Sequence, residues 1–274
     1  MHKSDFLFKA ALLIITQSEY MRSFVDELKS RSYPLFILGL LYFLCAFFCG
    51  SFIFLEKNQI GESLPFQTAL SALYTALMLW SLGWMNEYLY QKRSRFFFSL
   101  AYLLLHILFL FISVTTVIRG VQPNPIAEMP LERLNFKIYL FADAVFILLF
   151  SVNTWLLFSQ QKMPVSQQYS WGVRLGYLIF LLLLITDWAA HLSLFQSEIK
   201  PASRVAYFLS QWGSPVGGLR IAYFMGIFAL QILPLTANYV FKKKREVQIF
   251  ALSYVIGMIL LVIMTMLRQP LIPS

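Results

Sequence analysis

Apolar residues along this chain gather into long stretches, and the polar and charged residues collect between them. Each stretch reaches the length of about 20 residues that a helix rising about 1.5 Å per residue needs to cross the hydrocarbon layer of a membrane. The pattern predicts an all-α integral membrane protein, a seven-transmembrane helix bundle. The predicted spans are about 33–55, 66–90, 96–118, 138–158, 171–195, 221–241 and 247–267.

Composition agrees with this pattern. The chain is 59% hydrophobic and 13% charged, whereas soluble domains carry about 25% charged residues. The connections between spans are too short for a separate soluble domain. We therefore expect one membrane domain over 33–267, preceded by a cytoplasmic segment, 1–32, and followed by a short outer tail, 268–274.

The basic residues indicate an orientation. If the N-terminus is cytoplasmic, 14 of the 22 Lys and Arg residues lie on the cytoplasmic side, including the compact clusters at 92–95 and 242–245. The positive-inside rule then predicts an N-in, C-out topology. Membrane lipids are the expected partners of these charges. The net charge of +9 does not indicate nucleic-acid binding, because no basic soluble surface with interleaved aromatic residues accompanies it.

The first 32 residues predict an N-terminal amphipathic helix that lies in the membrane interface. The apolar run 10–15 is short for a signal peptide, and no small-residue cleavage site follows it. Pro34 then marks the entry into the first span. The apolar side of this helix would carry Phe6, Phe8, Leu12 and Leu13, and the water-facing side Arg22, Asp26, Glu27 and Lys29.

Ionisable residues inside the spans supply the site candidates, because a charge at the bilayer centre costs at least about 2.5–3.5 kcal/mol. From the helical rise, Asp143 and Asp187 both belong to the outer third of the membrane. Asp187 and His191 are four residues apart and share one helix face, where the carboxylate could orient and charge the imidazole. With Arg220 and Tyr223, they form a candidate ligand- or ion-binding cluster that lines an outward-facing cavity.

A structural role for the same cluster is the alternative. A buried aspartate can pair with Arg220 and hold the bundle together, and His191 can be an interfacial residue without chemistry. His106 is expected to be a hydrogen-bonded packing residue. Glu87, near the inner end of its span, is expected to face the interface beside Lys92 and Arg93.

No motif indicates a cofactor or a metal. Cys45 and Cys49 lie one helical turn apart, but a structural zinc site needs about four ligands and no further ligand pair accompanies them. Packing is the favoured role of these two thiols. No G-x-S-x-G, P-loop or Gly-rich nucleotide motif is present. The sequence therefore predicts no cofactor and leans away from an enzyme.

The outer connection at about 196–220 contains a Gly/Pro run at 213–218, which is typical of a turn and would lead the chain back into the sixth span. Residues 217–235 then read GGLRIAYFMGIFALQILPL. This segment resembles one in bacterial multi-pass inner-membrane proteins to which no activity is attached, which reads GDLR, a small residue, HF and GxHALQxLPL. Arg220, Gln231 and Pro234 match that pattern, whereas Tyr223 and Phe228 stand where it has histidines.

The resemblance implies a bacterial inner membrane, and two residues of the segment have physical roles of their own. Gln231 is a mid-span polar residue that can hydrogen-bond to another helix and join the ligand-binding candidates. Pro234 frees a backbone carbonyl and is the gating candidate, because a proline can bend a span.

These observations favour a small permease or carrier-like protein that binds a small molecule or ion in the outer cluster. The chain shows no inverted repeat in its Gly and Pro positions, which weakens this hypothesis. An accessory or assembly subunit of a membrane complex, with a membrane-protein partner, is the alternative. A membrane-embedded enzyme acting on a lipid or quinone is a weaker alternative, with Asp187 and His191 as an acid/base pair.

Overall fold

The computed structural model describes residues 23, 25–53, 64–89, 91–120, 130–160, 163–196 and 215–266. Every regular element in these ranges is a helix. In chain order the helices are α2 (Tyr33–Ile53), α3 (Leu64–Asn86), α4 (Lys92–Arg119), α5 (Pro130–Ser159), α6 (Gln167–Gln196), α8 (Pro215–Tyr239) and α9 (Lys244–Met266).

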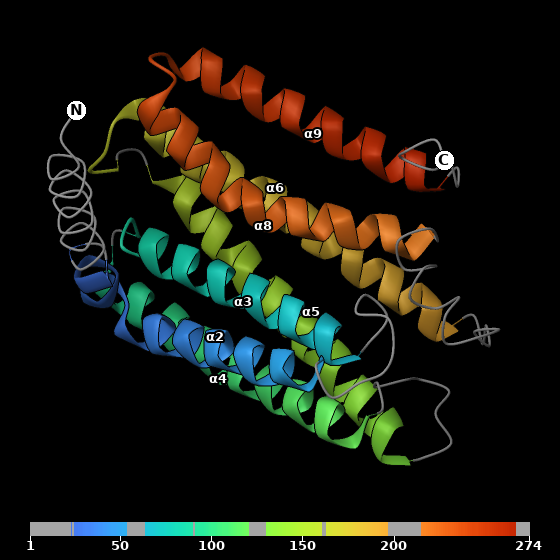
Figure 1. The fold of residues 1–274 in the computed structure, drawn as a ribbon. Coiled ribbons are helices and arrows are strands. Elements are labelled where there is room, and N and C mark those ends of the chain that lie inside the picture. The colour runs from blue at the N-terminus through green and yellow to red at the C-terminus, as the bar shows by residue number, and fades with distance from the viewer. Residues whose placement is uncertain are drawn as a thin grey trace, which may run out of the picture.

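The helices run along one common direction as a bundle, with α9 on its edge (Figure 1). Within the described ranges, five stretches are long and apolar enough to cross a membrane. They are Tyr33–Phe52, Thr68–Asn86, Lys92–Arg119, Pro130–Ser159 and Gln167–Thr186, and α8 adds the shorter apolar stretch Phe224–Tyr239. The chain therefore has the build of a multi-pass integral membrane protein.

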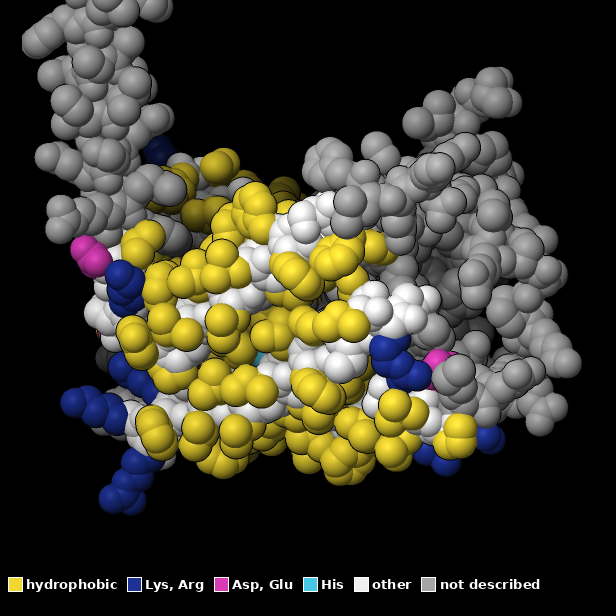
Figure 2. Space-filling view, turned by 60° about the horizontal axis from the view of Figure 1, so that its bottom comes forward, with side chains coloured by type: hydrophobic (Ala, Val, Ile, Leu, Met, Phe, Trp, Pro, Cys, Tyr) yellow, Lys and Arg dark blue, Asp and Glu magenta, His cyan; other side chains and the backbone are white. Residues whose placement is uncertain are grey.

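The surface shows the same division. On the face in Figure 2, a wide band of hydrophobic side chains separates Lys and Arg side chains at its two ends. Large apolar side chains such as Phe47, Phe111 and Phe141 are more than 60% exposed. Exposed aromatic and aliphatic side chains in a band of this kind suit contact with lipid acyl chains.

Several helices extend beyond the predicted spans. Helices α5 and α6 each contain 30 residues, which gives a length of about 45 Å against the ~30 Å hydrocarbon layer. Hydropathy identifies only the part of a helix that crosses the apolar layer. It does not predict the polar turns at the two ends of the helix.

The start of α8 corrects one prediction. Residues 215–218 of the Gly/Pro run form the first turn of α8 and not a turn between elements. Proline suits the first helical turn, where its missing N–H would have no partner. The glycines that follow join the helix at a moderate cost. Residues 197–214 lie outside the described residues.

The helical turns at 25–31 run almost directly into α2. Ser32 N donates to Leu28 O at 3.2 Å, and Phe36 N donates to Ser32 O at 3.0 Å. Pro34 lacks the N–H that would bond to the carbonyl of Ser30, which explains the break in the regular pattern at Ser32. Residues 1–22, with the predicted apolar face of the interfacial helix and Arg22, lie outside the described residues.

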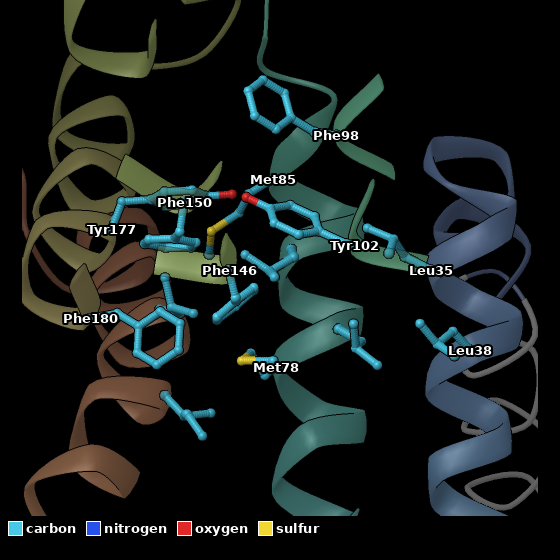
Figure 3. Close-up of a cluster of buried hydrophobic side chains, with 14 of the residues drawn as sticks. Leu35, Leu38, Met78, Met85, Phe98, Tyr102, Phe146, Phe150, Tyr177 and Phe180 are labelled. Carbon is cyan, nitrogen blue, oxygen red and sulfur yellow. The ribbon is translucent and has the colours of Figure 1, made fainter. Parts of the chain in front are cut away.

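Two groups of helices make the interior (Figure 1). Helices α2, α3 and α4 pack together on one side, and α6, α8 and α9 pack on the other. Helix α5 joins them through α4 and α6, and α3 touches α8 directly. The largest fully buried side chains include Tyr102, Phe150, Tyr177 and Phe180 (Figure 3). They lie where the two groups meet.

Candidate functional site

The predicted outer cluster is distributed over three helices. Asp143 is half-buried on α5. Asp187 and His191 lie on α6, and Arg220 and Tyr223 lie on α8. The side chains of these last four residues lie outside the described part of the structure, so only the placement of their helical turns can be given.

Helices α6 and α8 are in backbone contact along their length. A β-carbon added to Gly172 would lie 2.7 Å from Leu233 O and 3.0 Å from Pro234 Cα. One added to Gly176 would lie 2.9 Å from Ala229 O. The glycines of this GxxxG spacing therefore let the two helices approach more closely than any other residue would allow.

The same register extends toward the end of the bundle that is predicted to face outward. A β-carbon on Gly226 would lie 2.7 Å from Leu183 Cδ1, so α8 runs antiparallel to α6 with Gly226 beside this turn. If this register continues for one or two more helical turns, Tyr223 and Arg220 of α8 lie at the level of Asp187 on α6.

Helix α5 meets the same level of α6. Trp188 Nε1 donates to Leu140 O at 3.3 Å. The turn of α6 that carries Asp187 therefore lies beside the turn of α5 just before Asp143. The backbone therefore brings three of the proposed site's helical turns to one level.

Gln231 lies elsewhere, on the contact between α8 and α3. Its Nε2 donates to Ser81 Oγ at 3.0 Å and approaches Leu77 O at 3.5 Å. The prediction that Gln231 hydrogen-bonds across helices is confirmed. Two turns farther along the same contact, toward the start of α8, the ring centroids of Tyr74 and Phe224 lie 4.1 Å apart.

A buried polar cluster lies between α4, α5 and α6. Asn153 Nδ2 donates to the Tyr102 hydroxyl at 3.1 Å. Tyr177 stacks on Phe150 with ring centroids 4.9 Å apart and an interplanar angle of 10°. Tyr102, Asn153 and Tyr177 are each at most 1% exposed. Within the described part of the chain, Asn153 Oδ1 and the Tyr177 hydroxyl nevertheless have no hydrogen-bond partner.

His106 lies one turn from Tyr102 and is fully packed. Its Nδ1 is 2.9 Å from Tyr102 O, and its ring packs edge-on against Phe146 at 5.2 Å. This confirms its predicted packing role. The thiols of Cys45 and Cys49 are both buried, with their sulfur atoms 3.8 Å apart.

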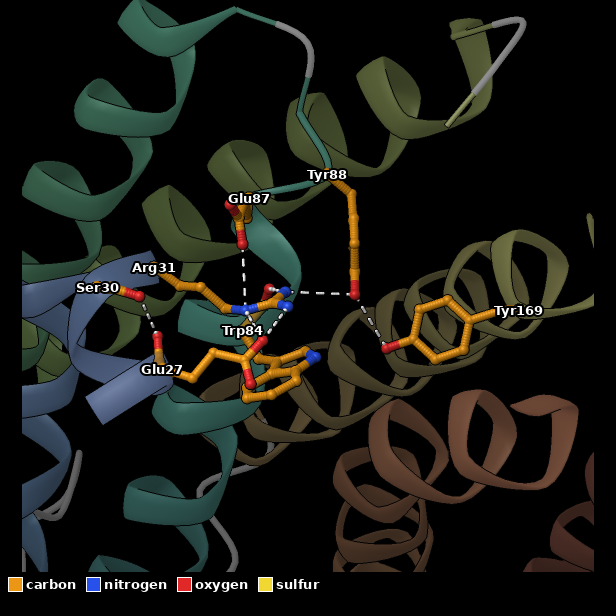
Figure 4. Close-up of polar contacts among 7 residues, drawn as sticks. All are labelled: Glu27, Ser30, Arg31, Trp84, Glu87, Tyr88 and Tyr169. Carbon is orange, nitrogen blue, oxygen red and sulfur yellow. Dashed lines mark hydrogen bonds and ion pairs between the residues drawn. The ribbon is translucent and has the colours of Figure 1, made fainter. Parts of the chain in front are cut away.

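Arg31 organises the end of the bundle that is predicted to face the cytoplasm (Figure 4). Its guanidinium lies 3.9 Å above the Trp84 ring and makes ion pairs with Glu27 at 2.6 Å and with Glu87 at 3.1 Å. The sequence predicted only that Glu87 faces the membrane interface near Lys92. The structure adds an ion pair between Glu87 and Arg31.

A chain of hydroxyls continues from this arginine. Arg31 Nη1 donates to the Tyr88 hydroxyl at 3.3 Å, which donates to the Tyr169 hydroxyl at 3.3 Å. Burial disfavours the charged guanidinium, but the bonds to Glu27 and Tyr88 outweigh this effect and raise the pKa of Arg31. Arg31 therefore stays charged at any physiological pH.

Sequence reasoning passed over the residues that organise this interior. Gly172 and Gly176 show the GxxxG spacing inside a predicted span, a signal that could have identified the α6–α8 contact. Asn153 is a mid-span amide, which could have marked the buried cluster. The pairing of Arg31 with Trp84 joins residues far apart in the chain, and no local pattern indicates it.

Within the described ranges, no three His, Cys, Asp or Glu side chains come together as a metal-binding group. Comparison of the chain with protein-family models, curated proteins and solved structures gives no match.

Proposed function

We propose that the chain is a small permease or carrier-like protein with seven spans in an N-in, C-out orientation. It binds a small molecule or ion through Asp143, Asp187, His191, Arg220 and Tyr223 near the outer face. One observation carries the proposal: α5, α6 and α8 bring the turns with Asp143, Asp187 and Arg220 to one level of the bundle. Charges are costly in a membrane, so carboxylates and a guanidinium at one depth favour a binding site.

The packing of the helices suggests how access to such a site changes. Pro234 lies against Gly172 of α6, so a bend at this proline would move α6 together with α8. The contact of α8 with α3 consists of side chains, including Gln231 and Ser81. In this proposal α6 and α8 move as one unit against α2, α3 and α4.

The inner membrane of a bacterium is the proposed location, because residues 217–235 resemble bacterial inner-membrane proteins. Lipids with anionic headgroups would contact the basic residues at the inner end. Exposed Lys92 and Arg93 lie beside Phe96 and Phe97, which are 67% and 57% exposed. Such a basic and aromatic rim suits a membrane interface.

Native mass spectrometry of the gently solubilised protein tests the binding site. A stoichiometric small molecule should accompany the wild type and be lost in Asp187→Asn. Thr186→Val is the matched control, because Thr186 is the exposed neighbour of Asp187 and its hydroxyl bonds to Leu182 O of its own helix. If a second polypeptide accompanies the wild type and no small molecule does, the chain is an accessory subunit of a membrane complex.

Cysteine labelling tests the orientation. Single cysteines at Lys243 and at Arg119 should react with a membrane-impermeant maleimide from opposite sides, Lys243 from the cytoplasm. Cys45 and Cys49 are at most 7% exposed and should contribute little background. Labelling of both positions from the same side would exclude the proposed topology.

A further inference from the structure

The buried cluster of Tyr102, Asn153 and Tyr177 has hydrogen-bonding capacity that the protein does not use. The Tyr102 hydroxyl oxygen accepts a bond from Asn153 Nδ2, so its own proton is still available to a further acceptor. Asn153 Oδ1 and the Tyr177 hydroxyl have no hydrogen-bond partner among the residues that the structure describes. If the two ends of the amide were exchanged, one amide atom and the Tyr177 hydroxyl would still be unpaired.

Unpaired polar atoms at this depth call for an explanation. Buried polar groups in native proteins almost always have a partner, and an unpaired one costs the free energy of a lost hydrogen bond. The three side chains come from three different helices and are at most 1% exposed. The usual partner of such groups is an internal water that makes about three hydrogen bonds.

The arrangement of the side chains points to a shared partner. Tyr102 of α4 and Tyr177 of α6 extend their hydroxyls toward each other (Figure 3). Asn153 joins this pair through Tyr102. Phe146 packs against Tyr102 at 5.7 Å, and Phe150 stacks on Tyr177 at 4.9 Å.

The side chains around Tyr102, Asn153 and Tyr177 also limit which chemical groups can bind there. Phenols, an amide and aromatic rings offer donors and acceptors without formal charge, and an ion among them would lose its hydration without a counter-charge. The partner must both accept a bond from a phenol and donate one to Asn153 Oδ1. A hydroxyl group does both.

We propose that Tyr102, Asn153 and Tyr177 form an internal binding site for one small, uncharged hydroxyl group. The group belongs either to a water molecule or to a neutral hydroxylated solute. It accepts a hydrogen bond from a phenol and donates one to Asn153 Oδ1. The site is separate from the outer cluster and does not depend on the proposed transport activity.

Hydroxyl-radical footprinting of the full-length protein in lipid vesicles tests this site, because radicals formed at a bound water modify the side chains that hold it. Tyr177 should be modified although it is 0% exposed, and modification should fall several-fold in Asn153→Leu. Thr154→Val is the matched control, since Thr154 is buried next in sequence and its hydroxyl already bonds to Phe150 O. This control should leave Tyr177 modification unchanged.

Glycerol distinguishes the two sources. Glycerol also scavenges hydroxyl radicals, so its effect on Tyr177 is compared with its effect on exposed Trp155. If glycerol protects Tyr177 more than Trp155, a solute hydroxyl occupies the site, and if it protects both equally, water does. An unmodified Tyr177 in the wild type, or equal modification in Asn153→Leu, overturns the proposal.

Tyr177→Phe gives a second measurement that does not depend on the Asn153 variant. This change keeps the ring that stacks on Phe150 and removes only the hydroxyl. In a dry site the loss of an unpaired hydroxyl should leave the melting temperature unchanged or raise it. In an occupied site it should lower the melting temperature, because a bound hydroxyl group loses a partner. An unchanged or raised value overturns the proposal.

Discussion

Helix α8 has two neighbours that it contacts in opposite ways. Against α6 it packs backbone to backbone, with Gly172 and Gly176 admitting the carbonyls of Leu233 and Ala229. Against α3 it packs through side chains, with Gln231 bonded to Ser81. We call the first contact the glycine interface. We call the meeting of the two helix groups the central seam, and its polar members are Ser81, Tyr88, Tyr102, Asn153, Tyr169, Tyr177 and Gln231.

The difference between the glycine interface and the central seam illustrates two ways in which helices associate in a membrane. Lipid tails are as apolar as leucine, so helices associate through close packing and through interhelical hydrogen bonds. The glycine interface uses the first source and leaves little room for alternatives. The central seam uses the second, and its hydrogen bonds can exchange partners with water or a ligand. Rearrangement and hydration are therefore expected at the seam.

The largest effect is expected from Gly172→Leu. Its β-carbon would lie 2.7 Å from Leu233 O and 2.8 Å from the Ala237 β-carbon, so α6 and α8 would have to separate. Overpacking of a core typically costs about 1–3 kcal/mol, and because a backbone atom is in the way we expect the upper end, about 3 kcal/mol. Unfolding by sodium dodecyl sulfate from mixed micelles measures it.

Gly257→Leu is the matched control for this experiment. Gly257 lies inside α9, and a β-carbon there has nothing within 4 Å. The same substitution should change the free energy of unfolding little. Leucine has a higher helix propensity than glycine, so propensity alone cannot lower the stability at either position. Equal losses at Gly172 and Gly257 would show that the added side chain itself, and not the glycine interface, determines the effect.

A smaller effect is expected from Arg31→Gln, at the end of the seam that is predicted to face the cytoplasm. The change removes the cation from the Trp84 ring and leaves Glu27 and Glu87 without their common partner. A cation–π contact contributes about 0.5–1 kcal/mol at an exposed site, and exposed ion pairs about 0–1 kcal/mol each. We expect a loss of about 1–2 kcal/mol in the same unfolding assay.

The pH dependence sharpens this prediction. The folded protein raises the pKa of Arg31, so the contribution of this titration is complete below the pKa of the unfolded arginine and is lost only in strongly alkaline solution. The difference between the wild type and Arg31→Gln should be constant from neutral to mildly alkaline pH. A difference that fades between pH 7 and pH 9 would contradict the role assigned to the guanidinium.

The sequence predicted the helices far better than their contacts. Each apolar stretch coincides with a helix, because the length and composition of a span are local properties. The first turn of α8 was missed, since Gly and Pro indicate a turn unless proline occupies the first helical turn.

The contacts between residues of the central seam could not be predicted from the sequence, because they join residues that are far apart in the chain. Ser81 and Gln231 lie 150 positions apart, and Tyr88 and Tyr169 lie 81 apart, so no periodicity pairs them. Arg31 was counted only as part of the positive charge of the inner side, although it stacks on Trp84. Gln231 was identified as a residue that bonds across helices, but its neighbour could not be named.

The smallest effect is expected at the bond between Gln231 and Ser81. A double-mutant cycle of Gln231→Leu and Ser81→Ala isolates this pair. Hydrogen bonds between membrane helices average about 0.6 kcal/mol and reach about 1.7 kcal/mol, so we expect a coupling within this range. The value should lie well below the loss in Gly172→Leu, because α8 remains attached to α6. A coupling as large as that loss would show that the seam, and not the glycine interface, holds α8 in the bundle.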